Sequence, residues 1–386
     1  MRISTGMLYQ TGVRTIQDQT TQMLHTQQQV ATGRRIVAPS DDPIASARAL
    51  EISQAQSLNS TFQTNQGSAK DSLNLLENKL YAVEDIITHT RTRAVEAGNG
   101  SYSDSEWGAI AIDIRASFDS LLGLANSQNG NGEYMFSGYQ ADVKPYVGNI
   151  NGVSFQGDQG QRTLQVSPSR IMSVSNSGSE VFNDVKAPQG EFFAVPGNPN
   201  GGTGYVASTQ TTGTYTGTQY LVSWDGTNYN VTDRATGAAV TSQTGPTLSF
   251  GNVQLEMAGT PSVGDVFEVG PSADVFKMYT NLTRALENPS SNGVSGAISQ
   301  AITGMDQSLD QVLTVHASVG SRMLEVNTLE DVGSDLDVQY ADTLSRLQDV
   351  DYAQAVSDLS LQQTYLQASQ QSFLKITNLS LFNYLG

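Results

Sequence analysis

Proline placement constrains the fold of this 386-residue chain more than any other sequence feature. No proline occurs between Pro43 and Pro145, and none follows Pro289. Because proline breaks helix interiors, both proline-free stretches can form long helices. The region 145–289 holds most of the prolines, over half of the glycines and several short Val-, Thr-, Tyr- and Phe-rich runs. We therefore predict a β-rich insert between two helical regions.

The first proline-free stretch has recognisable helix ends. Asp42 is a good N-cap, and Pro43 suits the first helical position. The segment 98–100 carries two glycines that stop the helix, and a capping box at Ser103 predicts a second helix that runs to about Asn126. When projected at about 100° per residue, apolar residues of the first helix share one side. They are Leu58, Phe62, Ala69, Leu73, Leu76, Leu80, Val83, Ile87 and Ala94.

A similar stripe runs through the C-terminal stretch, where we predict one helix of roughly 50 residues. The stripe consists of Leu329, Val332, Leu336, Tyr340, Leu347, Val350, Leu361, Tyr365, Ala368, Ile376 and Leu379. Such a helix is on the order of 75 Å long, which is longer than a compact domain is wide. A single copy therefore cannot bury it.

The N-terminal 30 residues carry a weaker stripe, so the two ends are expected to pair as a coiled coil and to leave apolar surface for neighbouring copies. We predict an assembly interface of Tyr9, Val13, Ile16, Met23, Val30, Leu361, Tyr365, Ala368, Ile376 and Leu379. The extreme ends have little apolar content and are expected to order only when partners cover them.

The predicted fold is mainly α with an all-β insert, divided into three domains. Residues 1–42 with 340–386 would form an inner, terminal coiled coil. Residues 43–144 with 275–339 would form a helical bundle, and 145–274 would form a β-rich outer domain. Within this insert, Asp225-Gly226 favours a hairpin with a type I′ turn. Further strands are predicted at 151–156, 162–167, 171–175, 246–257 and 265–270.

Composition argues against several function classes. The formal net charge is −17 with only 20 Lys and Arg, which disfavours nucleic acid as a partner. Without cysteine there is no disulfide, thiolate nucleophile or Cys-ligated zinc. No stretch has the apolar length of a signal peptide or a membrane span. We therefore predict neither membrane insertion nor a cleaved signal peptide.

No catalytic, cofactor-binding or metal-binding residue is predicted. His25, His89 and His316 lack partners at metal-ligand spacing and are expected on helix surfaces. Asp41 and Asp42 could serve acid–base chemistry or bind a metal, but their position before a helix favours capping. Tyr220, Trp224 and Tyr229 could form a sugar-binding platform, although alternating strand residues more often pack a β core.

Three segments carry a family resemblance. They are ATGRRIVAPSDDPIASARAL (31–50), LLGLANSQNGNGEYMFSGYQADVKPY (121–146) and the tail LSRLQDVDYAQAVSDLSLQQTYLQASQQSFLKITNLSLFNYLG (344–386). In these segments the chain resembles the flagellin superfamily and, within it, the hook-associated protein 3 family of hook-filament junction proteins. Pro39 and Pro43 favour the junction family over flagellins. The resemblance covers roughly 1–150 and 275–386 and leaves the insert unmatched.

The resemblance implies a non-enzymatic structural subunit that forms a ring with itself. Another hook-associated protein would lie on the hook side, and flagellin or a neighbouring junction layer on the filament side. It also implies type III export, a cytoplasmic export chaperone at the C-terminal region, and an extracellular location on the flagellum. Two alternatives stay open, a flagellin filament subunit and a secreted adhesive or carbohydrate-binding protein that uses the β insert.

Overall fold

The computed structural model describes residues 5–198, 200–290 and 293–385, and it leaves the side chains of residues 5, 8 and 376–385 undescribed. The chain forms two compact units. Unit 1 comprises Met1–Thr64 and Glu330–Gly386, and unit 2 comprises Asn65–Leu329. The division into three domains stays a prediction.

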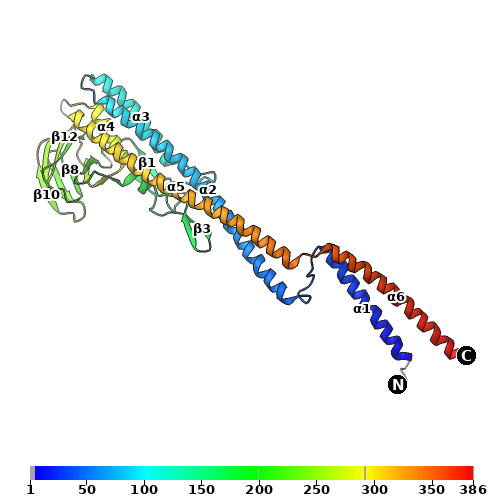
Figure 1. The fold of residues 1–386 in the computed structure, drawn as a ribbon. Helices are drawn as coiled ribbons and strands as arrows, with labels where there is room; N and C mark the ends of the chain where they lie inside the picture. Colours follow the sequence, from blue (N-terminus) through cyan, green and yellow to red (C-terminus); the bar gives the residue numbers. More distant parts are fainter. Residues whose placement is uncertain (1–4, 199, 291–292, 386) are drawn as a thin grey trace. The chain divides into compact units, whose positions relative to one another are not determined.

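Six α-helices lie in the described part of the chain (Figure 1). They are α1 (Thr5–Thr32), α2 (Pro43–Ala97), α3 (Asp104–Ala125), α4 (Val275–Glu287), α5 (Gly293–Gln348) and α6 (Tyr352–Leu385), and a five-residue π-helix spans Ser179–Asn183. The predicted ends of α2 and α3 are confirmed, including the capping box at Ser103. The long terminal helices and the β-rich middle confirm the predicted fold class.

The prediction of one continuous C-terminal helix is wrong, because the helix is interrupted between the end of α5 and the start of α6. Asp351 starts a new helix by accepting a hydrogen bond from the Gln354 amide at 3.1 Å. Just before it, the Val350 amide donates to the Gly33 carbonyl at 3.0 Å, so this backbone bonds across to another segment instead of continuing α5. The break changes the helical phase of every residue that follows.

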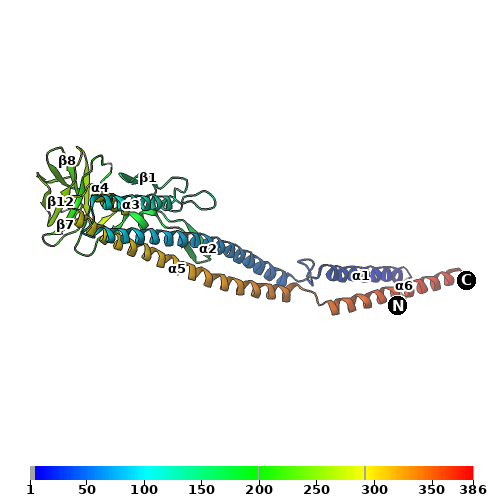
Figure 2. The ribbon, with the colours of Figure 1, turned by 90° about the horizontal axis from the view of Figure 1, so that it is seen from above.

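Unit 1 consists of two antiparallel helix pairs. In Figures 1 and 2, α1 lies beside α6, and the start of α2 lies beside the end of α5. The second pair is fixed by side-chain bonds in its interior. Gln56 donates to Asp337 at 2.9 Å, and Asn59 donates to the Gly333 carbonyl at 2.7 Å.

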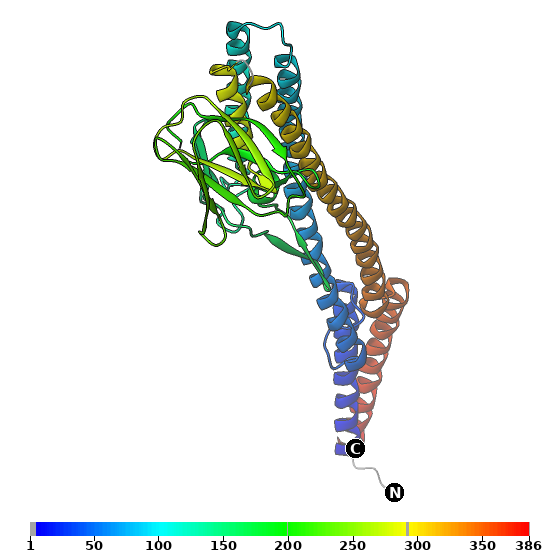
Figure 3. The same cartoon turned by 90° about the vertical axis from the view of Figure 1, so that its left-hand side faces the viewer.

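Unit 2 combines a helical core with small antiparallel sheets, which gather on one side of the helices in Figure 3. The sheet orders are β10-β9-β8-β13-β6, β11-β12-β7, β1-β2, β3-β4 and β14-β5. The strand bounds are β1 Tyr146–Asn149, β2 Gly152–Phe155, β3 Thr163–Ser167, β4 Arg170–Ser173, β5 Val185–Lys186, β6 Phe193–Pro196, β7 Tyr205–Thr211, β8 Tyr220–Trp224, β9 Tyr229–Asp233, β10 Ala239–Gln243, β11 Thr247–Phe250, β12 Val253–Ala258, β13 Val266–Gly270 and β14 Ser272–Ala273.

Helix α4 packs against both the helical core and the strands of unit 2, and almost all of its side chains are buried. Phe276 and Tyr279 pack against Phe118 of α3 with ring centroids 5.7 and 6.2 Å apart. Toward the strands, Asn281 exchanges two hydrogen bonds with the backbone of Val206, at 2.9 and 3.0 Å. Buried Arg284 donates to the Asn200 carbonyl at 3.1 Å, which ties the loop before β7 to the helix.

Two local predictions need correction. The hairpin of β8 and β9 exists, but its loop spans residues 225–228, and of these four described residues only Gly226 has a positive φ. A type I′ turn needs a positive φ at both central residues, so this turn is not type I′. The Asp225 carboxylate holds the loop by accepting from the Thr227 and Asn228 amides. The predicted apolar stripe of α2 is buried from Ala69 onward, whereas Leu58 is 54% exposed.

Candidate assembly surface

The α1 residues predicted for the interface face α6 within the same chain. Val13, Ile16, Met23 and Val30 are half-buried, whereas Tyr9 is exposed and its ring lies 5.2 Å from that of Phe373. Because α6 already covers this face in part, the stripe serves the pairing of the chain's own ends. Its role between copies stays a prediction.

The α6 residues predicted for the interface lie away from α1. Leu361, Tyr365 and Ala368 are all exposed. Instead, one face of α6 carries buried and half-buried residues at intervals of four and three, namely positions 355, 359, 362, 366, 369 and 373. We did not predict them, because the projection assumed no break before Tyr352. The Ile376 and Leu379 side chains lie outside the described residues.

Unit 1 thus leaves much apolar surface open. Besides Tyr9, Leu361 and Tyr365, its exposed large apolar residues are Met7, Leu24, Val37, Ile44, Leu50, Leu58, Val332, Val338, Tyr352, Val356 and Leu374. They occur on all four helices of the unit. Exposed apolar side chains on every helix of the unit therefore offer a partner surface that it could bury.

The segment 33–42, which we call the elbow, crosses from α1 to α2. Asp41 accepts from the Val37 and Ala38 amides at 3.0 and 2.8 Å and pairs with His25 at 3.1 Å. The Ala38 amide and then the His25 side chain lower the pKa of Asp41. Asp42 accepts from the Ala45 amide at 3.0 Å, which lowers its pKa and confirms the predicted N-cap.

The elbow is also bonded to the break between α5 and α6. The Arg35 amide donates to the Gln348 carbonyl at 2.6 Å, and its guanidinium donates to the Leu347 carbonyl at 2.9 Å. Arg34 and Asp349 form an isolated antiparallel bridge. Hydrogen bonds therefore hold the elbow against the break between α5 and α6.

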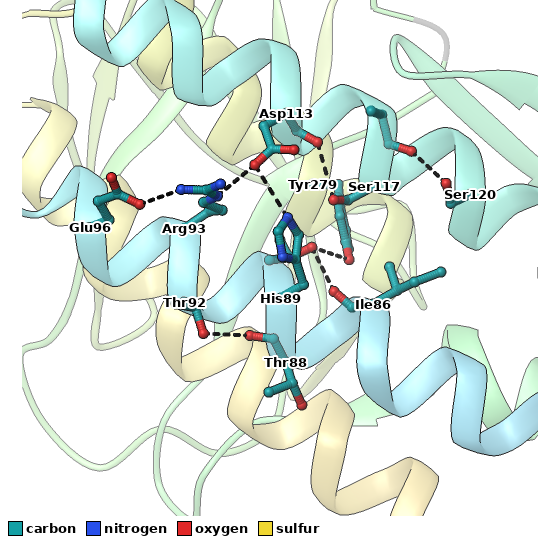
Figure 4. Close-up of polar contacts among 12 residues, drawn as sticks. Ile86, Thr88, His89, Thr92, Arg93, Glu96, Asp113, Ser117, Ser120 and Tyr279 are labelled. Atoms are coloured by element: carbon teal, nitrogen blue, oxygen red, sulfur yellow. Dashed lines mark hydrogen bonds and ion pairs between the residues drawn. The ribbon is translucent and has the colours of Figure 1, made fainter.

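The histidines have carboxylate partners that the sequence analysis did not identify. Figure 4 shows Asp113 of α3 between His89 and Arg93 of α2, at 3.2 and 2.6 Å. In unit 2, His316 lies 2.7 Å from Glu84, and its side chain is only 14% exposed. Its expected place on a helix surface is therefore wrong, because it packs edge-on against Tyr81 between α2 and α5. Among the described residues, no cluster of His, Cys, Asp or Glu could hold a metal ion.

The aromatic residues of the hairpin belong to the β core. Tyr220 and Tyr229 are buried, and Trp224 is partly buried against them, with its ring 4.5 Å from that of Tyr229. This confirms the packing interpretation over a sugar-binding platform. Within the described helices, none is both long and apolar enough to cross a bilayer.

Two family models match the chain. Residues 3–141 match the bacterial flagellin N-terminal helical region. Residues 198–271, in the insert that the sequence analysis left unmatched, match the D2-like domain of flagellar hook-associated protein 1.

Full-length relatives agree with these matches. The chain is 29% identical to flagellar hook-associated protein 3 of Salmonella typhimurium and 28% identical to that of Escherichia coli, over 99% of each chain. Among solved structures, it resembles hook-associated protein-3 from Legionella pneumophila (TM-score 0.56, 26% identity, 77% of this chain and 98% of that one). The FlgL structure from Xanthomonas campestris gives a TM-score of 0.55 at 26% identity and covers 76% of this chain and 99% of that one.

Proposed function

Since this chain is a homologue of flagellar hook-associated protein 3 in the flagellin superfamily, we propose that it is the structural subunit that joins the hook of a bacterial flagellum to its filament. Its relatives are structural flagellar proteins, and its function needs no bond chemistry. It is a component of the flagellum.

One observation supports this function most directly. The paired ends of the chain leave apolar side chains open, including Leu361 and Tyr365 on the side of α6 away from α1. Burial of such side chains against another subunit removes them from water and lowers the free energy of the assembly. A subunit built to stack between two assemblies needs surface of this kind on its terminal helices.

The partners follow from this function. The chain forms a ring with itself, with another hook-associated protein on the hook side and flagellin or a neighbouring junction layer on the filament side. It reaches this extracellular place through the flagellar type III apparatus. Before export, a cytoplasmic chaperone covers the C-terminal helical region, where the exposed residues of α6 support such a contact.

The mechanism is mechanical. Torque applied at the hook passes through the packed terminal helices into the filament. In unit 1, the bonds from the elbow to the end of α5 and to the break before α6 hold the crossing segments under load. In unit 2, the bonds of α4 to the loop before β7 hold the insert on the helical core.

Antibody labelling of isolated flagella tests this function. A surface epitope tag in the loop at 234–238 would give a narrow band beside the hook if the chain is the junction subunit. Label along the whole filament would identify a flagellin instead. Label absent from flagella altogether would contradict both.

A further inference from the structure

A groove in unit 1 lies between the elbow, the start of α2 and the end of α5. It encloses about 470 Å³. Its lining consists of Arg34, Ile36, Val37, Ala38, Pro39, Ser46, Ala49, Leu50, Ser53, Leu344 and Gln348. Buried Ala49 lies deep in this lining, whereas Leu50 is 71% exposed. The lining is mostly apolar and includes no acidic residue.

Among the described residues that line the groove, Arg34 alone is charged. Its backbone forms the bridge with Asp349, but its side chain forms no ion pair with any described residue. The groove therefore combines apolar walls with an unneutralised positive charge. That combination suits an apolar side chain flanked by carboxylates.

The end of α5 presents such a pattern. Asp331, Asp335, Val338 and Asp342 recur at intervals of four, three and four residues, so they form one row along the helix, which we call the acidic stripe. All four are exposed, and Val338 is 70% exposed. Asp342 pairs with Arg346 at 2.6 Å, whereas Asp331 and Asp335 have no ion-pair partner among the described residues.

The acidic stripe cannot enter the groove of its own chain. Asn59 bonds to the Gly333 carbonyl, so the α5 face at Gly333 looks toward α2. Val338 follows Gly333 by five residues, which places it about 140° around the helix from that face. The groove residue Leu344 is six residues further on and again about 120° away from Val338. Groove and stripe therefore look in different directions.

From this geometry we propose that the acidic stripe of one copy docks in the groove of a second copy, with Val338 against Leu50 and Asp335 beside Arg34. The contact joins two different surfaces, so it is heterologous. Repeated around an axis, such a contact forms a ring when the rotation from one copy to the next closes on itself, which the ring of the proposed function requires. This inference rests on the proposed function and names the surfaces that one subunit offers the next.

Cysteine cross-linking tests the proposal, because the natural chain contains no cysteine. A full-length Leu50→Cys/Val338→Cys variant is produced in cells, and the flagella are isolated and oxidised. We expect a ladder of disulfide-linked dimers, trimers and larger species under non-reducing conditions. Arg48→Cys/Val338→Cys is the control, because residue 48 is exposed and lies about 160° around α2 from Leu50. It should give no ladder.

Charge exchange tests the ionic part. Adding Asp335→Arg to the cross-linking variant should remove the ladder, and adding Arg34→Asp as well should restore it. If Asp335→Arg removes the ladder and the further change Arg34→Asp does not restore it, the pairing of these residues is overturned.

The other outcomes are also decisive. Dimers alone would overturn the heterologous contact, because a ring of heterologous contacts gives longer chains. A tagged variant that labels the junction but gives no ladder would overturn the docking and leave the proposed function intact. If the tagged natural chain does not label the junction, the proposed function itself fails.

Discussion

The ring of Phe373 on α6 lies directly over Gly12 on α1, so that a Cβ at residue 12 would come within 2.7 Å of the ring. Glycine is normally a poor helix residue, and its replacement by alanine in an exposed helix interior gains about 1 kcal/mol. Here the Phe373 ring occupies the space that a side chain at residue 12 would need. We expect Gly12→Leu to separate α1 from α6, measured as faster amide hydrogen exchange across residues 5–32.

Gly67 of α2 provides the matched comparison, because a Cβ there would meet no atom within 4 Å. Gly67→Ala should therefore stabilise the protein by roughly 0.5–1 kcal/mol in urea unfolding. Unchanged exchange in the Gly12 variant would show that Phe373 does not depend on this gap.

Tyr365 is 57% exposed on the side of α6 away from α1. If this side is buried between subunits, Tyr365→Asp places a charge in an apolar contact and prevents incorporation into flagella. The chain itself should unfold at the same temperature as the natural chain. Gln363→Asp, at another exposed position of the same helix, is the control and should incorporate normally.

The two ends of the chain should be needed for assembly and not for the folding of unit 2. Deleting residues 1–30 or 350–386 removes one partner of the α1–α6 pair. We expect either truncated chain to stay soluble with a cooperative unfolding transition, and to be missing from isolated flagella. Normal filament attachment with either truncation would contradict the assembly role of the ends.

Arg284 of α4 is 6% exposed, and burial lowers its pKa. Its guanidinium satisfies the carbonyls of Asn200 and Gly204 at 3.1 and 3.2 Å. Arg284→Leu leaves both without a partner and should cost about 2–4 kcal/mol in urea unfolding. Arg234→Ala breaks an exposed pair with Glu268 and should cost under about 1 kcal/mol. Equal losses would mean that the buried bonds contribute little.

Asp274 caps α4 by accepting from the Phe276 amide at 2.7 Å, and burial raises its pKa to about 7. The unfolded chain loses this proton near the ordinary value of 3.8, whereas the folded chain keeps it until about pH 7. Stability from this group is therefore present below pH 4 and is lost as pH rises from about 4 to 7.

Asp274→Asn keeps a capping oxygen but cannot ionise. At pH 8 it should be more stable than the natural chain by on the order of a few kcal/mol, and the difference should vanish near pH 4. Chemical unfolding at both values measures this. A constant difference across pH would contradict the burial of a titrating carboxyl.

Much of the fold could be read from the sequence because local signals determine helix ends. Asp42, Pro43 and Ser103 act through bonds and torsions within a few residues, so α2 and α3 begin where predicted. Proline and glycine placement likewise marks the insert, since their effects on the backbone are local. The buried stripe from Ala69 to Ala94 followed from helical period alone.

Other features depended on contacts distant in sequence, which no local pattern encodes. The break after Gln348 needs the elbow, because the Val350 amide bonds to Gly33 more than 300 residues away. Once the helix breaks, the projection that grouped Leu361 with Leu347 no longer holds. From the sequence, His316 was predicted to lie on a helix surface. In the fold, α2 places Glu84 beside its ring. The sequence alone thus determined which regions are helical and where α2 and α3 begin. Only tertiary structure decided where α5 gives way to α6 and which faces the helices turn to each other, because those features depend on contacts between distant residues.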